Sequence, residues 1–235
     1  MPHNLRKFHM LVVTGVMLAV SLGAACRKAG SATAYANITT LPVPGAKSEA
    51  GWPVYEVPAE GFALELPASW RQFEMDPRTF DAKFKELMKK NPQLEPEFGN
   101  LREQLVAGVK FFGFDEATLQ RGFATKILVL RQRLAPGEDL DSAVAESLTG
   151  LEDLPGVIKP FTHERLTMAT GDRERIKSKM TMNSPTGQQF TIAVTNFILT
   201  TDKDGYVVTL TTTADQEAKY AATFDRIGRG FRFIK

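Results

Sequence analysis

Residues 189–213 read QFTIAVTNFILTTDKDGYVVTLTTT and form the clearest structural signal of the chain. Two runs rich in β-branched and aromatic residues, 189–200 and 206–213, flank the polar stretch Asp202-Lys203-Asp204-Gly205. Such residues favour strands, and a short polar stretch with Asp-Gly between two of these runs is typical of a β-hairpin. We therefore predict an antiparallel hairpin here.

Similar patterns predict the other elements of the domain. Further strands are expected at 54–57, 62–66, 71–75, 111–114, 123–134, 162–169, 173–183 and 231–234. Apolar residues at helical spacing predict helices over 77–90, over 93–109, and from a cap at Asp139 or Asp141 to about 151. Because most strands follow one another through short turns, we expect a mainly antiparallel sheet flanked by helices, which is an α+β fold.

A fourth helix is predicted near the end of the sequence. Thr213-x-x-Gln216 has the pattern of a capping box that would open this helix. Tyr220, Phe224 and Ile227 share one face, and Gly228 and Gly230 are expected to end it. Four amphipathic helices are enough to cover the apolar surface of the sheet.

Two stretches carry a family resemblance. The first is Gly61-Phe-Ala-Leu-Glu-Leu-Pro-Ala-Ser-Trp70; the second is Tyr206-Val-Val-Thr-Leu-Thr followed by Tyr220-x-x-x-Phe224-x-x-Ile227 and Phe231-Arg-Phe. Together they resemble the opening and closing elements of the PsbP/Mog1-like superfamily. The resemblance implies an α/β/α sandwich over residues 52–235. It implies action by binding rather than chemistry, since members include photosystem-associated subunits, a Ran-binding protein and bacterial lipoproteins. No functional residue of the family maps onto this chain.

The first 26 residues have the anatomy of a lipoprotein signal. Arg6 and Lys7 precede an uncharged apolar run over 10–22, and the small residues Gly23-Ala24-Ala25 lead into Cys26, the only cysteine. The run is short for a membrane span, and a cysteine after the small residues resembles the bacterial lipobox. We predict a signal peptide over 1–25 and a lipid on Cys26. The alternative is an ordinary secretory signal followed by an incidental cysteine.

The predicted lipid determines the expected organisation and location. Residues 26–51 would be the lipid anchor and a flexible linker, because they are small, polar and without regular period; 52–235 would be the folded domain. We expect an exported chain anchored to the bacterial membrane or envelope, outside the cytoplasm. Removing the signal lowers Lys plus Arg from 29 to 27, which equals the 27 Asp plus Glu. Such a balance argues against nucleic acid as a partner.

The residues offer no recognisable chemistry. His163 would be the only histidine of the processed chain, and a zinc site normally needs three or four ligands. We therefore expect a surface histidine beside Glu164. Asp202-x-Asp204-Gly205 imitates the start of a calcium loop without its later carboxylates, so a hairpin turn explains it better. We predict no enzyme, no metal and no cofactor.

Two features are candidates for contact with a partner. Gly171-Asp-Arg-Glu-Arg175 is a dense charge cluster in which Arg173 and Arg175 could bind an anionic group, although a solvated turn with outward charges is the simpler interpretation. Phe111, in Phe111-Phe-Gly-Phe114, could be exposed by strand alternation, unless both faces of its strand are covered.

These observations leave two hypotheses for function. The first is a non-enzymatic accessory module that binds another component of the envelope through a protein–protein contact. The second is a tethered carrier of a lipid or other apolar ligand, held between sheet and helices and suggested by the 16 Phe residues.

The lipid anchor can be tested with a labelled fatty-acid analogue supplied to growing cells. We expect the wild-type chain to incorporate the label and Cys26→Ala to lose it, because only the thiol accepts the lipid. An unlabelled wild-type product that begins beyond Cys26 would contradict the anchor.

Overall fold

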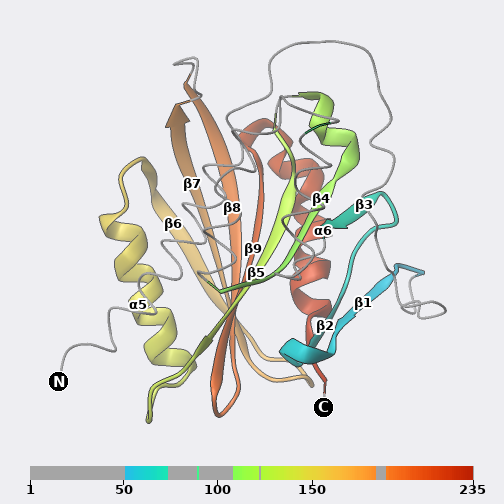
Figure 1. Cartoon of the computed structure of the whole chain (residues 1–235). Helices are drawn as coiled ribbons and strands as arrows, with labels where there is room; N and C mark the ends of the chain where they lie inside the picture. The colour runs from blue at the N-terminus through green and yellow to red at the C-terminus, as the bar shows by residue number, and fades with distance from the viewer. Residues whose placement is uncertain (1–50, 74–88, 90–107, 122, 184–188, 235) are drawn as a thin grey trace.

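A computed structural model of the chain describes residues 51–73, 89, 108–121, 123–183 and 189–234 (Figure 1). Its strands are β1 (Val54–Val57), β2 (Phe62–Glu65), β3 (Trp70–Phe73), β4 (Val109–Asp115), β5 (Lys126–Arg133), β6 (Val157–Leu166), β7 (Arg173–Asn183), β8 (Gln189–Thr200), β9 (Asp204–Thr213) and β10 (Arg232–Phe233). Its α-helices are α5 (Leu140–Asp153) and α6 (Glu217–Gly230), with short 3₁₀ turns at Pro58–Glu60, Glu116–Arg121 and Ala214–Gln216.

The strands form two antiparallel sheets. The large sheet has seven strands in the order β3-β4-β5-β9-β8-β7-β6, and the small sheet has three in the order β1-β2-β10. The predicted hairpin is confirmed as β8 and β9, in which Thr200 pairs with Gly205 and Ile192 with Thr213. It supplies two adjacent strands in the interior of the large sheet (Figure 1).

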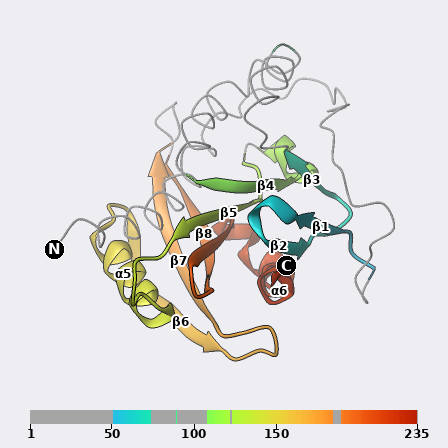
Figure 2. The ribbon, with the colours of Figure 1, turned by 60° about the horizontal axis from the view of Figure 1, so that its bottom comes forward.

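Apolar side chains line both faces of the large sheet. In β5, Leu128 and Leu130 belong to one buried cluster, and Ile127 and Val129 belong to the other. The first cluster includes residues of α5; the second includes residues of α6 and of the small sheet. We call these two sides the α5 face and the α6 face (Figure 2). The predicted α+β fold, a mainly antiparallel sheet flanked by helices, is confirmed, with a second small sheet added on the α6 face.

Helix α5 begins as the sequence predicts. Asp139 is its N-cap, and the Asp139 carboxylate accepts a hydrogen bond from the backbone N–H of Ser142 at 2.9 Å. The Ser142 hydroxyl in turn accepts from the backbone N–H of Asp139, which completes a capping box. Hydrogen bonds from Ser142 to the ionised carboxylate lower the pKa of Asp139.

The start of α6 differs from the prediction, and its end agrees in part. Thr213 makes no side-chain cap, and Ala214–Gln216 form a 3₁₀ turn before the helix begins at Glu217. The expected capping box is therefore wrong. Gly228 lies inside the helix rather than at its end, whereas Gly230 is its last residue, as expected. The predicted buried face of Tyr220, Phe224 and Ile227 is confirmed.

The two helices expected over 77–90 and 93–109 fall almost entirely outside the described residues. Lys89 is helical, in agreement with the first, whereas Val109 is the first residue of β4, so the second cannot extend that far. Among the residues that the structure describes, no helix combines the length and the apolar character that a bilayer crossing requires.

Gly228 sets how closely α6 approaches the large sheet. A Cβ atom at Gly228 would lie 2.1 Å from Cε2 of the Phe197 ring on β8, whereas at Gly230 the nearest atom, in Glu65, would be 3.7 Å away. Gly228 is therefore required by close packing and not by helix termination.

We expect Gly228→Ala to lower the free energy of unfolding by about 1–3 kcal/mol, because the clash outweighs the better helix propensity of alanine. Chemical denaturation measures the change. Gly230→Ala, two residues away in the same helix, is the matched control and should be neutral or slightly stabilising. Equal stability of the two variants would contradict the packing role of Gly228.

Candidate functional site

Phe111 does not present a surface to a partner. It is 0% exposed and packs edge-to-face on Tyr55 of β1, with ring centroids 5.9 Å apart. Phe112 and Phe114 lie in the apolar cluster on the opposite face. The expectation of an exposed Phe111 is wrong because the small sheet covers the α6 face of β4, and the alternative, that both faces are covered, holds.

Arg173 is also buried, in contrast to both interpretations of the charge cluster. The guanidinium is 0% exposed and donates to the carbonyl oxygens of Gly228 at 2.6 Å and Phe231 at 3.1 Å. A further bond reaches the Thr170 hydroxyl at 2.6 Å. Arg173 thus caps the carboxyl end of α6, where the helix dipole favours a cation. Burial, and to a lesser extent nearby Arg229, lowers the pKa of Arg173.

The neighbours of Arg173 point to alternate faces of the sheet. Arg175, on the α6 face, is ion-paired with Asp225 of α6 and Glu164 of β6. Glu174, on the α5 face, is buried and binds the Nδ1 of His163 at 2.7 Å and the Nε of Arg165 at 2.9 Å. The three residues form ion pairs and a helix cap, so the expectation of outward charges is wrong for Arg173 and Glu174. The exposed turn at Gly171 and Asp172, which leads into β7, agrees with the expectation.

His163 lies on the surface, as expected, with a side chain that is 51% exposed. Its partner is Glu174 on the adjacent strand rather than Glu164. The Asp202–Gly205 segment is a hairpin turn, as predicted, and the Asp204 carboxylate binds the guanidinium of Arg131 at 3.0 Å. Within the described residues there is no group of three His, Cys, Asp or Glu side chains able to hold a metal.

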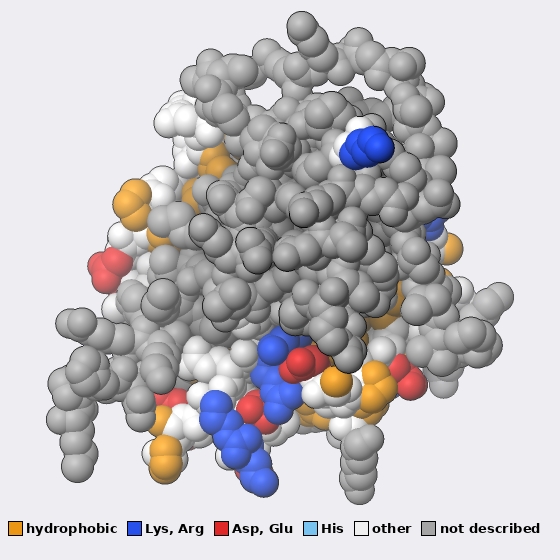
Figure 3. All heavy atoms as spheres, viewed as in Figure 1, with side chains coloured by type: hydrophobic (Ala, Val, Ile, Leu, Met, Phe, Trp, Pro, Cys, Tyr) orange, Lys and Arg blue, Asp and Glu red, His pale blue; other side chains and the backbone are white. Residues whose placement is uncertain are grey.

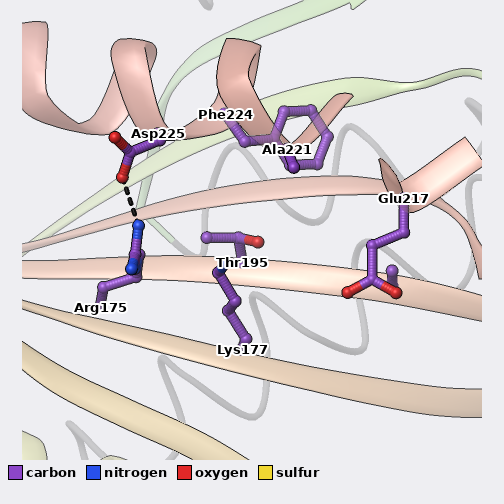
Figure 4. Close-up of a pocket in the computed structure, with 8 residues that line it drawn as sticks. Arg175, Lys177, Thr195, Glu217, Ala221, Phe224 and Asp225 are labelled. Atoms are coloured by element: carbon purple, nitrogen blue, oxygen red, sulfur yellow. Dashed lines mark hydrogen bonds and ion pairs between the residues drawn. The ribbon is translucent and has the colours of Figure 1, made fainter. Parts of the chain in front are cut away.

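A row of basic side chains follows Arg175 along β7. Arg175, Lys177 and Lys179 alternate with buried residues and share the α6 face. Lys179 binds Glu217 at the start of α6, with Nζ 2.9 Å from the carboxylate. Lys177 lies between these two ion-paired residues (Figure 4) and has no hydrogen-bond or ion-pair partner in the part of the chain that the structure describes.

The hollow beside this row is small. It lies between α6 and strands β7 and β8, and Arg175, Lys177, Thr195, Glu217, Phe224 and Asp225 line it (Figure 4). Its volume of about 20 Å³ is room for roughly one water molecule. It is therefore not a site for a small organic ligand.

Beyond α6, no helix among the described residues covers the α6 face of β6. Helix α6 packs mainly on β9, β2 and β8, and most residues of β6, the strand at the edge of the large sheet, are exposed. Ile158 pairs with Lys179, so it shares the α6 face, and at 42% it is the exposed large hydrophobic residue among those described. We call Ile158, Thr162, Glu164, Lys177 and Lys179 the β6–β7 patch.

The described surface elsewhere mixes both signs of charge. Figure 3 shows Lys and Arg side chains next to Asp and Glu side chains on the face drawn there. One such group joins the two sheets: Arg131 of β5 binds Glu60 at 3.2 Å and Asp204 at 3.0 Å, and Lys110 reaches Glu60 at 3.4 Å. These pairs hold the small sheet in place and have a structural role.

Comparison with known proteins yields likeness in structure alone, since no family model and no curated protein matches the sequence. The solution structure of cyanobacterial PsbP (CyanoP) from Synechocystis sp. PCC 6803 superposes with a TM-score of 0.50 at 9% identity, over 81% of this chain and 98% of that one. The chain has a PsbP/Mog1-like fold. This structural similarity confirms the fold that the sequence resemblance implied, and it does not indicate a function.

Two other solved structures are similar at lower scores. LpqN, described as involved in cell envelope biogenesis of Mycobacterium tuberculosis, has a TM-score of 0.47 at 12% identity, over 74% of this chain and 83% of that one. The Ran-binding protein Mog1p of Saccharomyces cerevisiae has a TM-score of 0.41 at 13% identity, over 79% and 96%.

Sequence reasoning missed the roles of Arg173 and Lys177. A buried arginine has no local signature, because its acceptors are carbonyl groups more than 50 residues away. The position of Lys177 on the face of the sheet could have been predicted. Arg175, Lys177 and Lys179 alternate with apolar and small residues in a strand that the sequence itself predicts.

The capping role of Arg173 is testable by substitution. We expect Arg173→Met to lower the free energy of unfolding by about 2–4 kcal/mol, because it leaves buried carbonyl groups without a donor. Arg133→Met is the control: Arg133 is 67% exposed with one long ion pair at 3.7 Å, so its loss should change stability by less than about 0.5 kcal/mol. Thermal and chemical denaturation give both values, and equal values would contradict the cap.

Proposed function

We propose that this protein is an exported, lipid-anchored module without catalytic activity, which binds a protein partner of the cell envelope through the β6–β7 patch. The observation that carries the proposal is Ile158, an exposed apolar side chain on an edge strand. It lies near Lys177, which has no ion-pair partner among the described residues, and opposite the ion-paired Lys179. Apolar anchors with charged surroundings are the usual anatomy of a protein–protein contact.

The patch also specifies the chemistry of the partner. A complementary surface would offer an apolar recess for Ile158 and a carboxylate for Lys177, which has no acidic neighbour bound to it in the described structure. Glu217 and Glu164 already neutralise Lys179 and Arg175. We therefore expect one acidic group opposite Lys177 rather than a strongly acidic partner surface.

The edge of the sheet supports binding through side chains. Lys159, Glu164 and Arg165 place charges along β6, and Pro160 lacks a backbone N–H to offer to another strand. Charges and proline on an edge strand disfavour pairing with further strands. The partner would accordingly contact the α6 face of β6 and β7 rather than extend the sheet.

The anchor would set where the contact occurs. Two acyl chains on Cys26 give stable membrane attachment. The predicted linker over 26–51 would allow the domain to move about 25–30 Å from the bilayer, if it behaves as a flexible chain. A membrane protein of the envelope, or another protein near its surface, lies within this reach.

The lack of catalytic activity is part of the proposal. The one histidine of the processed chain directs Nδ1 to Glu174, which also binds Arg165, so both groups take part in an ion-paired cluster on a strand. This arrangement fits a structural role for His163 better than proton transfer to a substrate.

Affinity purification from mildly solubilised membranes tests the proposal. The wild-type chain should retain a stoichiometric protein, and Ile158→Glu combined with Lys177→Glu should lower its binding by roughly 30-fold or more, because the pair removes an apolar anchor and reverses a charge. Lys203→Glu, a charge reversal in the exposed β8–β9 turn, is the matched control and should bind normally.

Two results would contradict the proposal. One is a wild-type preparation that carries no partner under mild conditions. The other is a partner that binds the double variant as tightly as the wild type, which would place the contact elsewhere. Unchanged thermal unfolding of the double variant shows that any loss of binding is not a loss of fold.

A further inference from the structure

Ion pairs between β7 and α6 form a row with a gap in the middle. Arg175, Lys177 and Lys179 follow one another on the α6 face of β7, about 7 Å apart, because every second residue of a strand points to the same side. Arg175 binds Asp225 at one end of the row, and Lys179 binds Glu217 at the other end. Lys177, in the middle, has no ion-pair partner among the described residues.

The sequence of α6 explains this gap. Glu217, Ala221 and Asp225 are four residues apart, so they lie on one side of the helix with neighbouring Cβ atoms about 5–6 Å apart. The first and the last of them carry the carboxylates that bind β7, and the middle one is alanine. Ala221 and Lys177 line the same hollow (Figure 4). The alanine therefore occupies the position from which a third carboxylate would face Lys177.

The hollow beside Ala221 has the size and the donors to hold one oxygen atom of an anion. Its volume of about 20 Å³ accepts a single atom the size of a water molecule. Lys177 pairs directly with Thr195 of β8, so an ammonium and a hydroxyl, both able to donate, share this side of the sheet. Every residue that lines the hollow belongs to the described part of the chain, and Ala221 at its rim is exposed.

The charges around the hollow favour one class of anion. Glu217 and Asp225 also line it, and each already binds a cation of β7 (Figure 4). One positive charge, on Lys177, is left for a ligand, and a second negative charge on that ligand would be repelled by the two carboxylates. A carboxylate carries one charge and is planar, so one of its oxygens can enter while the rest of the molecule stays outside. A phosphate or sulfate dianion does not meet these conditions.

We infer that this hollow binds one carboxylate group from outside the chain, with an oxygen on the Lys177 ammonium and the Thr195 hydroxyl. The carboxylate completes the row of ion pairs that Ala221 interrupts. Its source is an Asp or Glu side chain of the partner that binds the β6–β7 patch, so the contact extends from the edge strand across β7 to α6. This source rests on the proposed function, whereas the carboxylate site itself does not.

Titration with acetate tests the site without a partner. The isotope-labelled full chain, purified in a mild detergent, is titrated at constant ionic strength, and the backbone amide signals of Lys177 and Thr195 are followed by NMR. We expect a saturable shift with half-saturation in the millimolar range, because one ion pair and one hydrogen bond bind weakly. Lys177→Met should reduce the shift by about threefold or more. Sulfate should give a smaller shift than acetate.

A carboxylate supplied by the chain itself should block the site. Ala221→Glu places one opposite Lys177, so the acetate shift should disappear. The midpoint of thermal unfolding should exceed that of Ala221→Gln by about 2–4 °C, and this difference should vanish when Lys177→Met is added. Ala218→Glu is the matched control, because it adds the same charge at an exposed position of α6 that does not line the hollow. It should keep the acetate shift.

The outcomes separate this inference from the proposed function. Equal acetate shifts in the wild type, Lys177→Met and Ala221→Glu would overturn the carboxylate site, as would a wild type that shows no shift. A partner that is lost on Ile158→Glu but binds Ala221→Glu like the wild type would overturn the inferred source, while the proposed contact stands. If no partner is captured, the proposed function fails, and the acetate titration alone decides whether the site exists.

Discussion

Burial of both faces of the large sheet is the constraint on which the structure depends. Strands β5, β8 and β9 alternate apolar side chains between two separate clusters, so neither face can be left to water. On one side, α5 covers part of the large sheet. On the other side, α6 and the small sheet together bury the apolar side chains of the large sheet. The close approach of Gly228 to Phe197 and the cap that Arg173 places on α6 follow from this demand, because both bring the helix against the sheet.

Most of the fold could be predicted from local patterns. The bounds of β7 and β8 agree with the alternation of residues 173–183 and 189–200, and Asp139 begins α5 as its capping pattern indicates. The predictions were wrong where residues that are distant in the sequence determine the local structure. Gly228 has the local pattern of a helix end, yet it lies inside α6 because the ring of Phe197, about 30 residues earlier, takes the space of a side chain.

The same limit applies to the candidate sites. Arg173 has the sequence context of an exposed charge, and only the carbonyl groups at the end of α6 give it a buried role. Asn196, Thr209 and Thr211 are ordinary strand residues in sequence, and only the register of β8 and β9 shows that they share one buried face of the sheet. The lipid on Cys26 rests on the sequence alone, because the described residues begin at Gly51.

The order of strands in the small sheet has a mechanical consequence. Among the described strands, β1 is hydrogen-bonded to β2 alone, besides the packing of Tyr55 on Phe111, and β2 is paired on its other side with β10, which directly follows α6. Any pull on the chain ahead of Val54 is therefore carried first by one ladder of four residue pairs and then by the segment that leaves α6. The first described strand is thus supported, through β2, by β10, which lies more than 150 residues later in the sequence. A force applied at Val54 therefore acts on both the first and the last strand of the described fold.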